Sequence, residues 1–411
     1  MHDSDLITSE IYKPYRYSLA LTSQFYFCGI PFRLDTAPKC ALNCLYCFAM
    51  TRGGRRTSKN LLASPAKIAR KLKRSLNEHE SETDIVDSFL QKRMPVHFGG
   101  MSDPFATSDV TFVSCQMLDI LGEYDYPVVL STKNTKVMVQ DSTLRHFEKL
   151  KHLIVQVSFS LSDQISRKIE PCVPPPRERL KAIKALTSEG IYVIARLQPL
   201  FPHKFDEIVQ DLIPSLSEVG VQHVVVEFLK LPVESNISLV KHLFKNLGWD
   251  GYSFYRDKGA LRVGREWILP LQYRWESLQP VIKQIRAYGM TYGAGDYGLN
   301  HLGDTDCCCG IDRVPGFSNW FHGNIAFYLR NNRTSVIIFD QSAFESLPDR
   351  PVGMYINSHS RIHNHNTLFE YLRLKWNQPG TANAPDSYFG ISWKGDIDEN
   401  GNCVYYREGS I

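Results

Sequence analysis

Between about residue 25 and residue 231, short apolar runs alternate with amphipathic stretches. Six runs are rich in β-branched or aromatic residues, as is typical of strands: FYFCGIPF, MPVHFGG, YPVVLSTK, LIVQVSFSL, IYVIARLQPL and HVVVEFLKL. Residues 64–78 predict a helix that Ser64 can cap, and residues 174–190 predict another that Gly190 ends. Strands that alternate with helices indicate a parallel sheet covered by helices. We therefore expect an α/β fold with a partial (β/α)6 TIM-like barrel.

The regular pattern covers only part of the chain. From about residue 251 it gives way to segments rich in Tyr, Trp and Gly, with one more possible strand in MTYGAGDYGL, and a less regular tail begins near residue 300. The sequence thus predicts an N-terminal segment (1–24), a core domain (25–250) and a smaller, less regular C-terminal region (251–411). Neither an internal repeat nor a low-complexity linker interrupts it.

Composition narrows the setting of the protein. The chain has 411 residues, a mild net charge of +4 and ten cysteines. The first residues, MHDSDLITSE, lack the basic flank and apolar core of a secretory signal, and no apolar run reaches the length of a membrane span. We therefore expect a cytoplasmic protein with no membrane partner. Because thiols stay reduced in the cytoplasm, the cysteines indicate chemistry rather than a disulfide framework.

Three of these cysteines, Cys40, Cys44 and Cys47, fall in the short stretch PKCALNCLYCFAM. They follow the first predicted strand, where a parallel barrel keeps its active-site loops. Three thiolates on one loop can hold three irons of a [4Fe–4S] cluster and leave the fourth iron open for a substrate. The alternatives are a zinc site with a distant fourth ligand, or buried structural thiols.

The C-x3-C-x2-C spacing, with Tyr46 before the last cysteine, resembles the radical S-adenosylmethionine (SAM) superfamily. In that superfamily the open iron chelates SAM, and an electron from the cluster cleaves SAM to a 5′-deoxyadenosyl radical that abstracts hydrogen from a substrate. The motifs SDPF, STK and EPCVPPPRERLKAI make residues 25–230 similar to its spore photoproduct lyase-like group. The resemblance also implies an electron donor such as flavodoxin or ferredoxin.

The resemblance assigns SAM-binding roles to further residues. Gly99 and Gly100 correspond to a glycine pair whose backbone approaches the SAM amino group, although Met101 stands where an acid often follows and Asp103 is the nearest substitute. Tyr46 belongs to the cluster motif. Three residues would contact SAM, with Ser160 as the alternative serine: Lys133, Ser158 and Arg196. The arginine offers a guanidinium fork that matches the SAM carboxylate.

A second cluster, Cys307, Cys308 and Cys309, lies in the stretch GDTDCCCGID. Because neighbouring side chains diverge in regular backbone, we expect at most two of these thiols to face one site. The resemblance to the spore photoproduct lyase-like group, in which a cysteine returns a hydrogen atom to a product radical, makes Cys308 and Cys309 candidate catalytic residues. Two alternatives stay open, namely an auxiliary metal held with His301 or Asp306 and simple packing. Cys28, Cys115 and Cys403 are isolated and indicate packing.

The substrate is suggested by charge. Nine basic residues and no acid lie between Arg52 and Arg74, directly after the triplet: Arg52, Arg55, Arg56, Lys59, Lys67, Arg70, Lys71, Lys73 and Arg74. Such a run can bind phosphates, so we expect a nucleic-acid partner, with DNA favoured; it can also be a solvated helix face. The alternatives are a radical SAM enzyme that modifies a peptide, protein or metabolite, and a non-catalytic iron–sulfur or zinc protein.

Overall fold

The structure is a computed structural model, and it describes residues 13–47, 49, 61–77, 84–161, 163–234, 237–344, 347–352 and 366–408. Its centre is an eight-stranded sheet with the linear order β13-β9-β8-β7-β6-β5-β3-β2. All neighbouring strands pair in parallel except β2, which runs antiparallel to β3. The strands, in chain order, are β2 (Leu19–Leu21), β3 (Phe32–Leu34), β5 (Val96–Phe98), β6 (Val128–Thr132), β7 (Leu153–Phe159), β8 (Tyr192–Leu200), β9 (His223–Phe228) and β13 (Thr291–Ala294).

The predicted fold class is confirmed, because five of the six predicted runs contain the strands β5 to β9 of a mostly parallel sheet covered by helices. Within the described residues the edge strands β13 and β2 are not paired with each other, so the barrel is partial. Strand β13, from the stretch MTYGAGDYGL, adds a seventh parallel strand next to β9.

The prediction of a strand in the first apolar run, FYFCGIPF, is wrong. Residues 25–31 form turns, and β3 begins only at Phe32. The amides of Phe27 and Cys28 both donate to the carbonyl of Gln24, which curls the chain at this point. The aromatic residues that suggested a strand instead pack as part of this turn, where the ring of Phe25 meets that of Phe321 edge-on.

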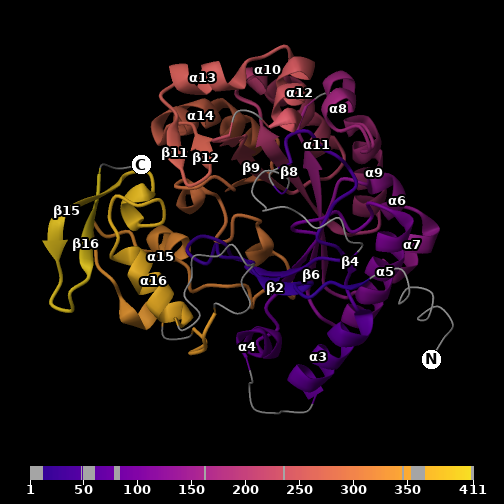
Figure 1. Cartoon of the computed structure of the whole chain (residues 1–411), viewed down its shortest axis with the longest axis horizontal. Helices are drawn as coiled ribbons and strands as arrows, with labels where there is room; N and C mark the ends of the chain where they lie inside the picture. The colour runs from indigo at the N-terminus through magenta and orange to yellow at the C-terminus, as the bar shows by residue number, and fades with distance from the viewer. Residues whose placement is uncertain are drawn as a thin grey trace.

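Helices follow the parallel strands and lie along the outside of the sheet (Figure 1). They are α3 (Pro65–Asn77), α4 (Ile85–Gln91), α5 (Ser108–Glu123), α6 (Thr135–Met138), α7 (Asp141–Phe147), α8 (Asp163–Ile169), α9 (Pro176–Ser188), α10 (Phe205–Glu207), α11 (Ile213–Glu218), α12 (Ser238–Leu247), α13 (Gly251–Asp257) and α14 (Leu271–Ala287). The two predicted helices are confirmed as α3 and α9, and Gly190, at φ +78°, ends the second. Ile183 and Leu186 of α9 are buried in the main core.

The last part of the chain forms a smaller layer beside the barrel, drawn in orange and yellow in Figure 1. Its elements are α15 (Ile325–Asn331), α16 (Leu368–Trp376), β14 (Val336–Ile337), β15 (Ile391–Ile397) and β16 (Cys403–Arg407). Another small sheet combines β10 (Leu231–Pro232), β11 (Leu261–Val263) and β12 (Glu266–Ile268), and β1 (Lys13–Pro14) pairs with β4 (Leu61–Leu62). Because β2 and β13 both join the central sheet, the predicted division at 24 and 250 does not follow its edges, and the division into domains stays a prediction. None of the described helices combines the length and apolar character that a bilayer crossing needs.

Alternation along the strands gives the sheet two different faces. Residues such as Leu130, Val155 and Val224 face the helices and belong to the main core. Their neighbours point to the inner face, where Val129 and Ile154 belong to a second apolar cluster with residues 307–320. Side chains near the carboxyl ends of the strands and side chains near their amino ends can therefore both place functional groups on the inner face.

Candidate active site

The cysteine triplet lies in the loop that follows β3, at the carboxyl end of the parallel strands. Asn43 takes a left-handed conformation with φ 51°, and the amide of Cys47 donates to the carbonyl of Cys44 at 3.1 Å. The amide of Leu45 donates to the carbonyl of Ile169 at 2.9 Å, which ties this loop to the end of α8. The backbone therefore fixes the loop independently of any bound group.

The three thiols are close enough to affect one another. Burial raises the pKa of Cys40 and of Cys44 to about 12, and Cys47 adds to both increases. Lys133 acts in the opposite direction on Cys44. Thiols with such pKa values stay protonated at neutral pH unless a metal displaces the proton. Cys40 and Cys44 would therefore release their protons when a metal group binds.

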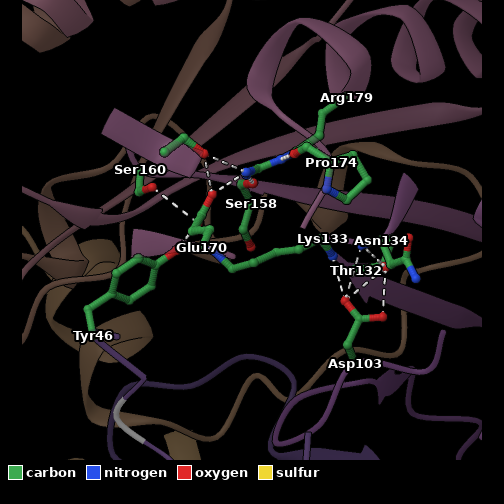
Figure 2. Close-up of polar contacts among 11 residues, drawn as sticks. Tyr46, Asp103, Thr132, Lys133, Asn134, Ser158, Ser160, Glu170, Pro174 and Arg179 are labelled. Carbon is green, nitrogen blue, oxygen red and sulfur yellow. Dashed lines mark hydrogen bonds and ion pairs between the residues drawn. The ribbon is translucent and has the colours of Figure 1, made fainter. Parts of the chain in front are cut away.

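Beside this loop, the buried carboxylate of Glu170 joins four elements of the barrel (Figure 2). Ser160 donates to it from the end of β7 at 3.1 Å, and Ser166 donates from α8 at 2.8 Å. Arg179 of α9, itself fully buried, forms an ion pair with the same carboxylate. Burial alone would raise the pKa of Glu170, but Lys133 and Arg179 outweigh it and hold the pKa well below its usual range.

Two residues predicted from the sequence meet at this carboxylate. Lys133, directly after β6, places its Nζ 3.0 Å from Glu170 Oε1 and 2.6 Å from the Tyr46 hydroxyl (Figure 2). Tyr46 donates its own hydroxyl hydrogen to Glu170. The lysine therefore presents a fixed positive charge at the carboxyl end of the strands, next to Cys44.

The predicted glycine pair lies in the loop after β5. Gly99 has φ +90°, and a Cβ there would come within 2.5 Å of the Ser131 carbonyl oxygen, so only glycine fits. The carboxylate of Asp103 does not extend toward open space. It accepts from the Thr132 hydroxyl at 3.0 Å and from the Lys133 amide at 2.6 Å, which holds the loop that carries Lys133 (Figure 2).

Further from the carboxyl end, a row of polar side chains crosses the inner face from β5 to β9. His97 shares a hydrogen bond with Ser131 at 2.6 Å, and Ser131 donates to Gln156 at 2.8 Å. Arg196 donates to Gln156 at 3.3 Å and to Gln198, which in turn donates to Glu227. Burial and the Arg196 charge lower the pKa of His97 to about 4, so this imidazole is neutral at pH 7.

Two of the predicted SAM ligands, Ser158 and Arg196, are paired neighbours in the register of β7 and β8. Ser158 lies beside Lys133 in Figure 2. Arg196 belongs to the polar row, and its charge adds to the hydrogen bonds from Cys307 and Cys308 that lower the pKa of Cys309. The structure thus brings Cys44, Tyr46 and Lys133 together, whereas Arg196 is engaged with the second group of thiols.

That second group lies against the amino-terminal halves of the strands. The Sγ atoms of Cys307, Cys308 and Cys309 all lie within 4.8 Å of one another. The expectation that at most two of them face one site is therefore wrong. The chain makes a tight turn here, in which the Gly310 amide donates to the Cys307 carbonyl at 2.8 Å. A turn can direct consecutive side chains to one side, which regular backbone cannot. Whether Cys308 and Cys309 return hydrogen to a substrate stays a prediction.

Cys28, expected to be an isolated packing residue, lies with this group. Burial raises the pKa of its thiol to about 12, and Cys309 adds to that increase. Hydrogen bonds from Cys307 and Cys308 hold the pKa of Cys309 well below its usual range. We refer to Cys28, Cys307, Cys308 and Cys309 as the inner thiol group.

The basic run is only partly described. Arg52, Arg55, Arg56 and Lys59 lie outside the described residues, and the other five lie on α3. Lys71 pairs there with Asp84 at 2.6 Å, and Arg74 pairs with Asp87 at 2.9 Å. These acids of the α4 region neutralise part of the predicted basic surface, while Lys67 and Arg70 remain exposed.

An arginine-lined pocket of about 770 Å³ lies between α14, α15 and the C-terminal sheet, and the sequence patterns did not reveal it. Its polar lining includes Arg286, His301, Arg330, Arg333 and Arg407. Asp304 and Asp306 pair with Arg286 and Arg330 at 2.7 and 3.0 Å. Burial, followed by the Arg407 charge, lowers the pKa of His301 to about 3, so the imidazole is neutral and the guanidinium groups set the charge of the pocket.

Comparison with known proteins bears on the fold. No protein-family model matches the sequence, and no curated protein matches it. A solved spore photoproduct lyase, a mutant with phenylalanine in place of one tyrosine, aligns with 67% of this chain and 79% of its own at a TM-score of 0.50 and 16% identity. This chain has the spore photoproduct lyase fold. Another mutant of that lyase, with serine in place of one cysteine (TM-score 0.48, 15% identity), covers 67% of this chain and 77% of its own. SuiB from Streptococcus suis bound to SAM (TM-score 0.34, 17% identity) covers 54% and 44%.

Sequence reasoning missed three participants in these sites. Glu170 and Arg179 lie in the stretch EPCVPPPRERL, which the resemblance marked without giving either a role. No signal in the sequence marks Glu170 as buried; the structure shows that it is, and a buried acid requires a cationic partner. Cys28 had no such signal either, because only the folding of the chain places it beside residues 307–309.

Proposed function

We propose that this protein is a radical SAM enzyme that abstracts hydrogen from a nucleobase. The observation that carries the proposal is the set of three mutually interacting thiols at the carboxyl end of a partial parallel barrel, beside a lysine with a fixed position. The spore photoproduct lyase fold supports the same assignment. Cys40, Cys44 and Cys47 would hold a [4Fe–4S] cluster, and they fit it in number and in loop position.

When bound, the cluster supplies the electron that cleaves the sulfonium of SAM to methionine and a 5′-deoxyadenosyl radical. The residues of this chain would bind and orient SAM. Lys133 offers a positive charge toward its carboxylate, and Ser158 lies beside that lysine on the inner face. Gly99 and Gly100 would offer backbone groups to SAM, as the resemblance implies, and Gly99 lets this loop pack against the Ser131 carbonyl.

Glu170 serves this arrangement indirectly. It binds Lys133 and Tyr46 and is itself held by Arg179, so it fixes the ammonium group where SAM would lie. The resemblance implied that Arg196 binds SAM, and this stays a prediction; its guanidinium already donates to Gln156 and Gln198. We therefore favour Lys133 over Arg196 as the residue that binds the SAM carboxylate.

A nucleic-acid substrate is supported by two basic surfaces. Lys67 and Arg70 are exposed on α3, which begins after the cluster loop. The arginine-lined pocket offers several guanidinium groups, which match phosphate oxygens in charge and geometry. Most affinity for nucleic acid comes from such phosphate contacts, whereas the base must be exposed to the radical separately.

Three measurements test the proposal. Anaerobically reconstituted protein should hold about four irons and four sulfides, and the reduced protein should form 5′-deoxyadenosine from SAM. With deuterated candidate substrates, deuterium should enter 5′-deoxyadenosine only from an oligonucleotide. Transfer from a peptide or a metabolite instead would retain the radical SAM activity and overturn the substrate class.

DNA binding gives an independent measurement. Replacing Arg55 and Arg56 together with alanine should weaken DNA retention and lower the salt slope by roughly two units, because about two fewer counterions are released. SAM cleavage without substrate should be unchanged. If DNA affinity at low salt is the same as in the wild type, this part of the chain does not bind phosphate.

A further inference from the structure

The inner thiol group brings several sulfur atoms together, whereas hydrogen donation needs only one. Cys307, Cys308 and Cys309 form the one group of three or more Cys, His, Asp or Glu ligand atoms within 4.8 Å among the described residues. The Sγ atoms of Cys308 and Cys309 are 3.9 Å apart. A tetrahedral zinc ion with bonds of about 2.3 Å holds its sulfurs about 3.8 Å apart. The spacing therefore corresponds to ligands of one ion.

A cluster of several irons fits this spacing less well. In a cubane cluster each cysteine binds a different iron, so the sulfurs lie around a larger body. The triplet 40/44/47 follows that pattern, because its sulfurs influence one another yet do not form a group within 4.8 Å. The two cysteine groups therefore favour different metal groups.

The backbone around the inner thiol group is fixed before any ion binds. His223 donates its Nε2 hydrogen to the Cys308 carbonyl, 2.9 Å away. Asp312 accepts from the amide of Cys307 at 3.1 Å, and Thr305 donates to the Cys307 carbonyl at 2.7 Å. A Cβ at Gly293 would come within 1.9 Å of the Cys308 carbonyl oxygen, so β13 accommodates the turn only because it has glycine there.

The surroundings suit a soft metal ion. Ile30, Val129, Ile194, Phe317 and Trp320 pack around the thiols and limit the access of water and of competing ligands. Cys28 packs against the same cluster, and a Cβ at the adjacent Gly29 would come within 2.5 Å of Cys307 Sγ. Its own sulfur is not part of the group within 4.8 Å, so a rotation of the Cys28 side chain would bring it in as the fourth ligand.

We propose that Cys28, Cys307, Cys308 and Cys309 bind one zinc ion in tetrahedral coordination on the inner face of the barrel. The ion joins the turn before β3 to the turn after β13, and so fixes the two edges of the parallel sheet to the C-terminal segment. A zinc-bound thiolate carries no S–H hydrogen, so zinc binding and hydrogen donation by the same sulfur exclude each other. The zinc site does not depend on the proposed cluster.

Metal analysis and X-ray absorption test the site on the full chain. The isolated protein should contain about one zinc per chain, with four sulfur neighbours at about 2.3 Å. Replacing the metal with Co²⁺ should give the intense visible bands of tetrahedral thiolate coordination. Nitrogen or oxygen neighbours in place of sulfur, or no zinc after growth with added zinc, would overturn the proposal.

Matched cysteine variants locate the ion. Cys308→Ser should reduce zinc to near zero, while Cys115→Ser, at an isolated buried cysteine of α5, should keep it. If Cys308→Ser does not fold, alkylation of the native wild type replaces it. The four inner thiols should react only after a zinc chelator is added, and equal reaction without chelator would overturn the site.

The same preparations separate this proposal from the proposed function. Iron content and SAM cleavage that persist in a protein without zinc would overturn only the zinc site. Zinc that persists in a protein without iron or SAM cleavage would overturn only the radical SAM function. Altered reaction products from a folded Cys308→Ala protein, if the wild type itself holds no zinc, would assign that thiol to hydrogen donation instead.

Discussion

The two cysteine groups lie at opposite ends of the same inner face, and their surroundings differ. The triplet 40/44/47 lies at the carboxyl end of the strands, among Lys133, Glu170 and the Tyr46 hydroxyl. The inner thiol group lies against the amino-terminal halves of the strands, among aliphatic and aromatic side chains. Charged, hydrogen-bonding surroundings can bind and orient a polar cofactor, whereas apolar ones exclude water and favour a permanent structural ion.

The polar row from His97 to Glu227 lies between the two groups, and the charge of its Arg196 acts on Cys309 of the inner thiol group. Its side chains hydrogen-bond mainly to one another, so it forms a layer across the barrel between the end proposed to react and the end proposed to be structural. The contrast teaches that equal residue types at the two ends of one barrel can serve different chemistry, and each prediction below tests one side of it.

The largest effect is expected at the triplet. Cys44→Ala should lose the iron and reduce SAM cleavage to background, because three thiolates are the minimum for a cluster with an open iron. Iron and sulfide analysis with a 5′-deoxyadenosine assay measures this. Cys115→Ala is the control and should keep both. If Cys44→Ala keeps its iron while Cys308→Ser loses it, the roles of the two groups are reversed.

The next effect concerns the buried carboxylate beside the triplet. Glu170→Gln should lower the free energy of unfolding by about 3–5 kcal/mol, because it leaves the fully buried guanidinium of Arg179 without a charged partner. Urea denaturation measures the loss. Glu178→Gln on the same helix as Arg179 is the control and should cost less than about 1 kcal/mol, since its ion pairs with Arg177 and Lys181 are exposed.

A double variant sharpens this result. Glu170→Gln combined with Arg179→Met removes both buried charges, so it should recover part of the stability that Glu170→Gln loses. An equal or larger loss in the double variant would show that the two residues contribute independently, and the carboxylate would not owe its role to this ion pair.

A smaller effect is expected in SAM binding. Lys133→Ala should weaken SAM binding by about 10–100-fold, which corresponds to the loss of one charged hydrogen bond of about 1.5–3 kcal/mol. Ser158→Ala should have a weaker effect in the same direction, and both variants should keep the cluster. Equilibrium binding to the iron-loaded protein measures it. Lys136→Ala, at an exposed lysine of α6, is the control. Normal SAM binding in both variants would remove these residues from the site.

The smallest effect concerns the arginine-lined pocket. Arg333 is exposed at the pocket, so Arg333→Ala should reduce the salt slope of DNA binding by about one unit, as expected for one phosphate contact. Titrations at several salt concentrations measure the slope. Lys184→Ala on the outer helix α9 should leave it unchanged. Equal slopes for the two variants would exclude the pocket from DNA binding.

Local sequence was sufficient for the features that depend on neighbouring residues. Strands β5 to β9 and helices α3 and α9 follow from apolar periodicity and capping residues, which act over a few positions. The triplet follows from its own spacing, whereas the requirement for glycine at Gly99 comes from its contact with the Ser131 carbonyl of β6. The same local reasoning failed at residues 25–31, because the aromatic residues there pack against Phe321 and Tyr371 in the C-terminal part of the chain.

Only the tertiary structure decided which distant residues share a site. Lys133 and Tyr46, 87 positions apart, meet because the strands before them end at the same edge of the sheet. Cys28 meets Cys308 and Cys309 because β13 closes one side of the sheet and brings the following turn under the strands. Neither of these contacts can be predicted from local composition, because the free energy that maintains them comes from burial across the whole barrel. The sequence therefore identified the cysteines, and the tertiary structure decided which thiols lie in the same site.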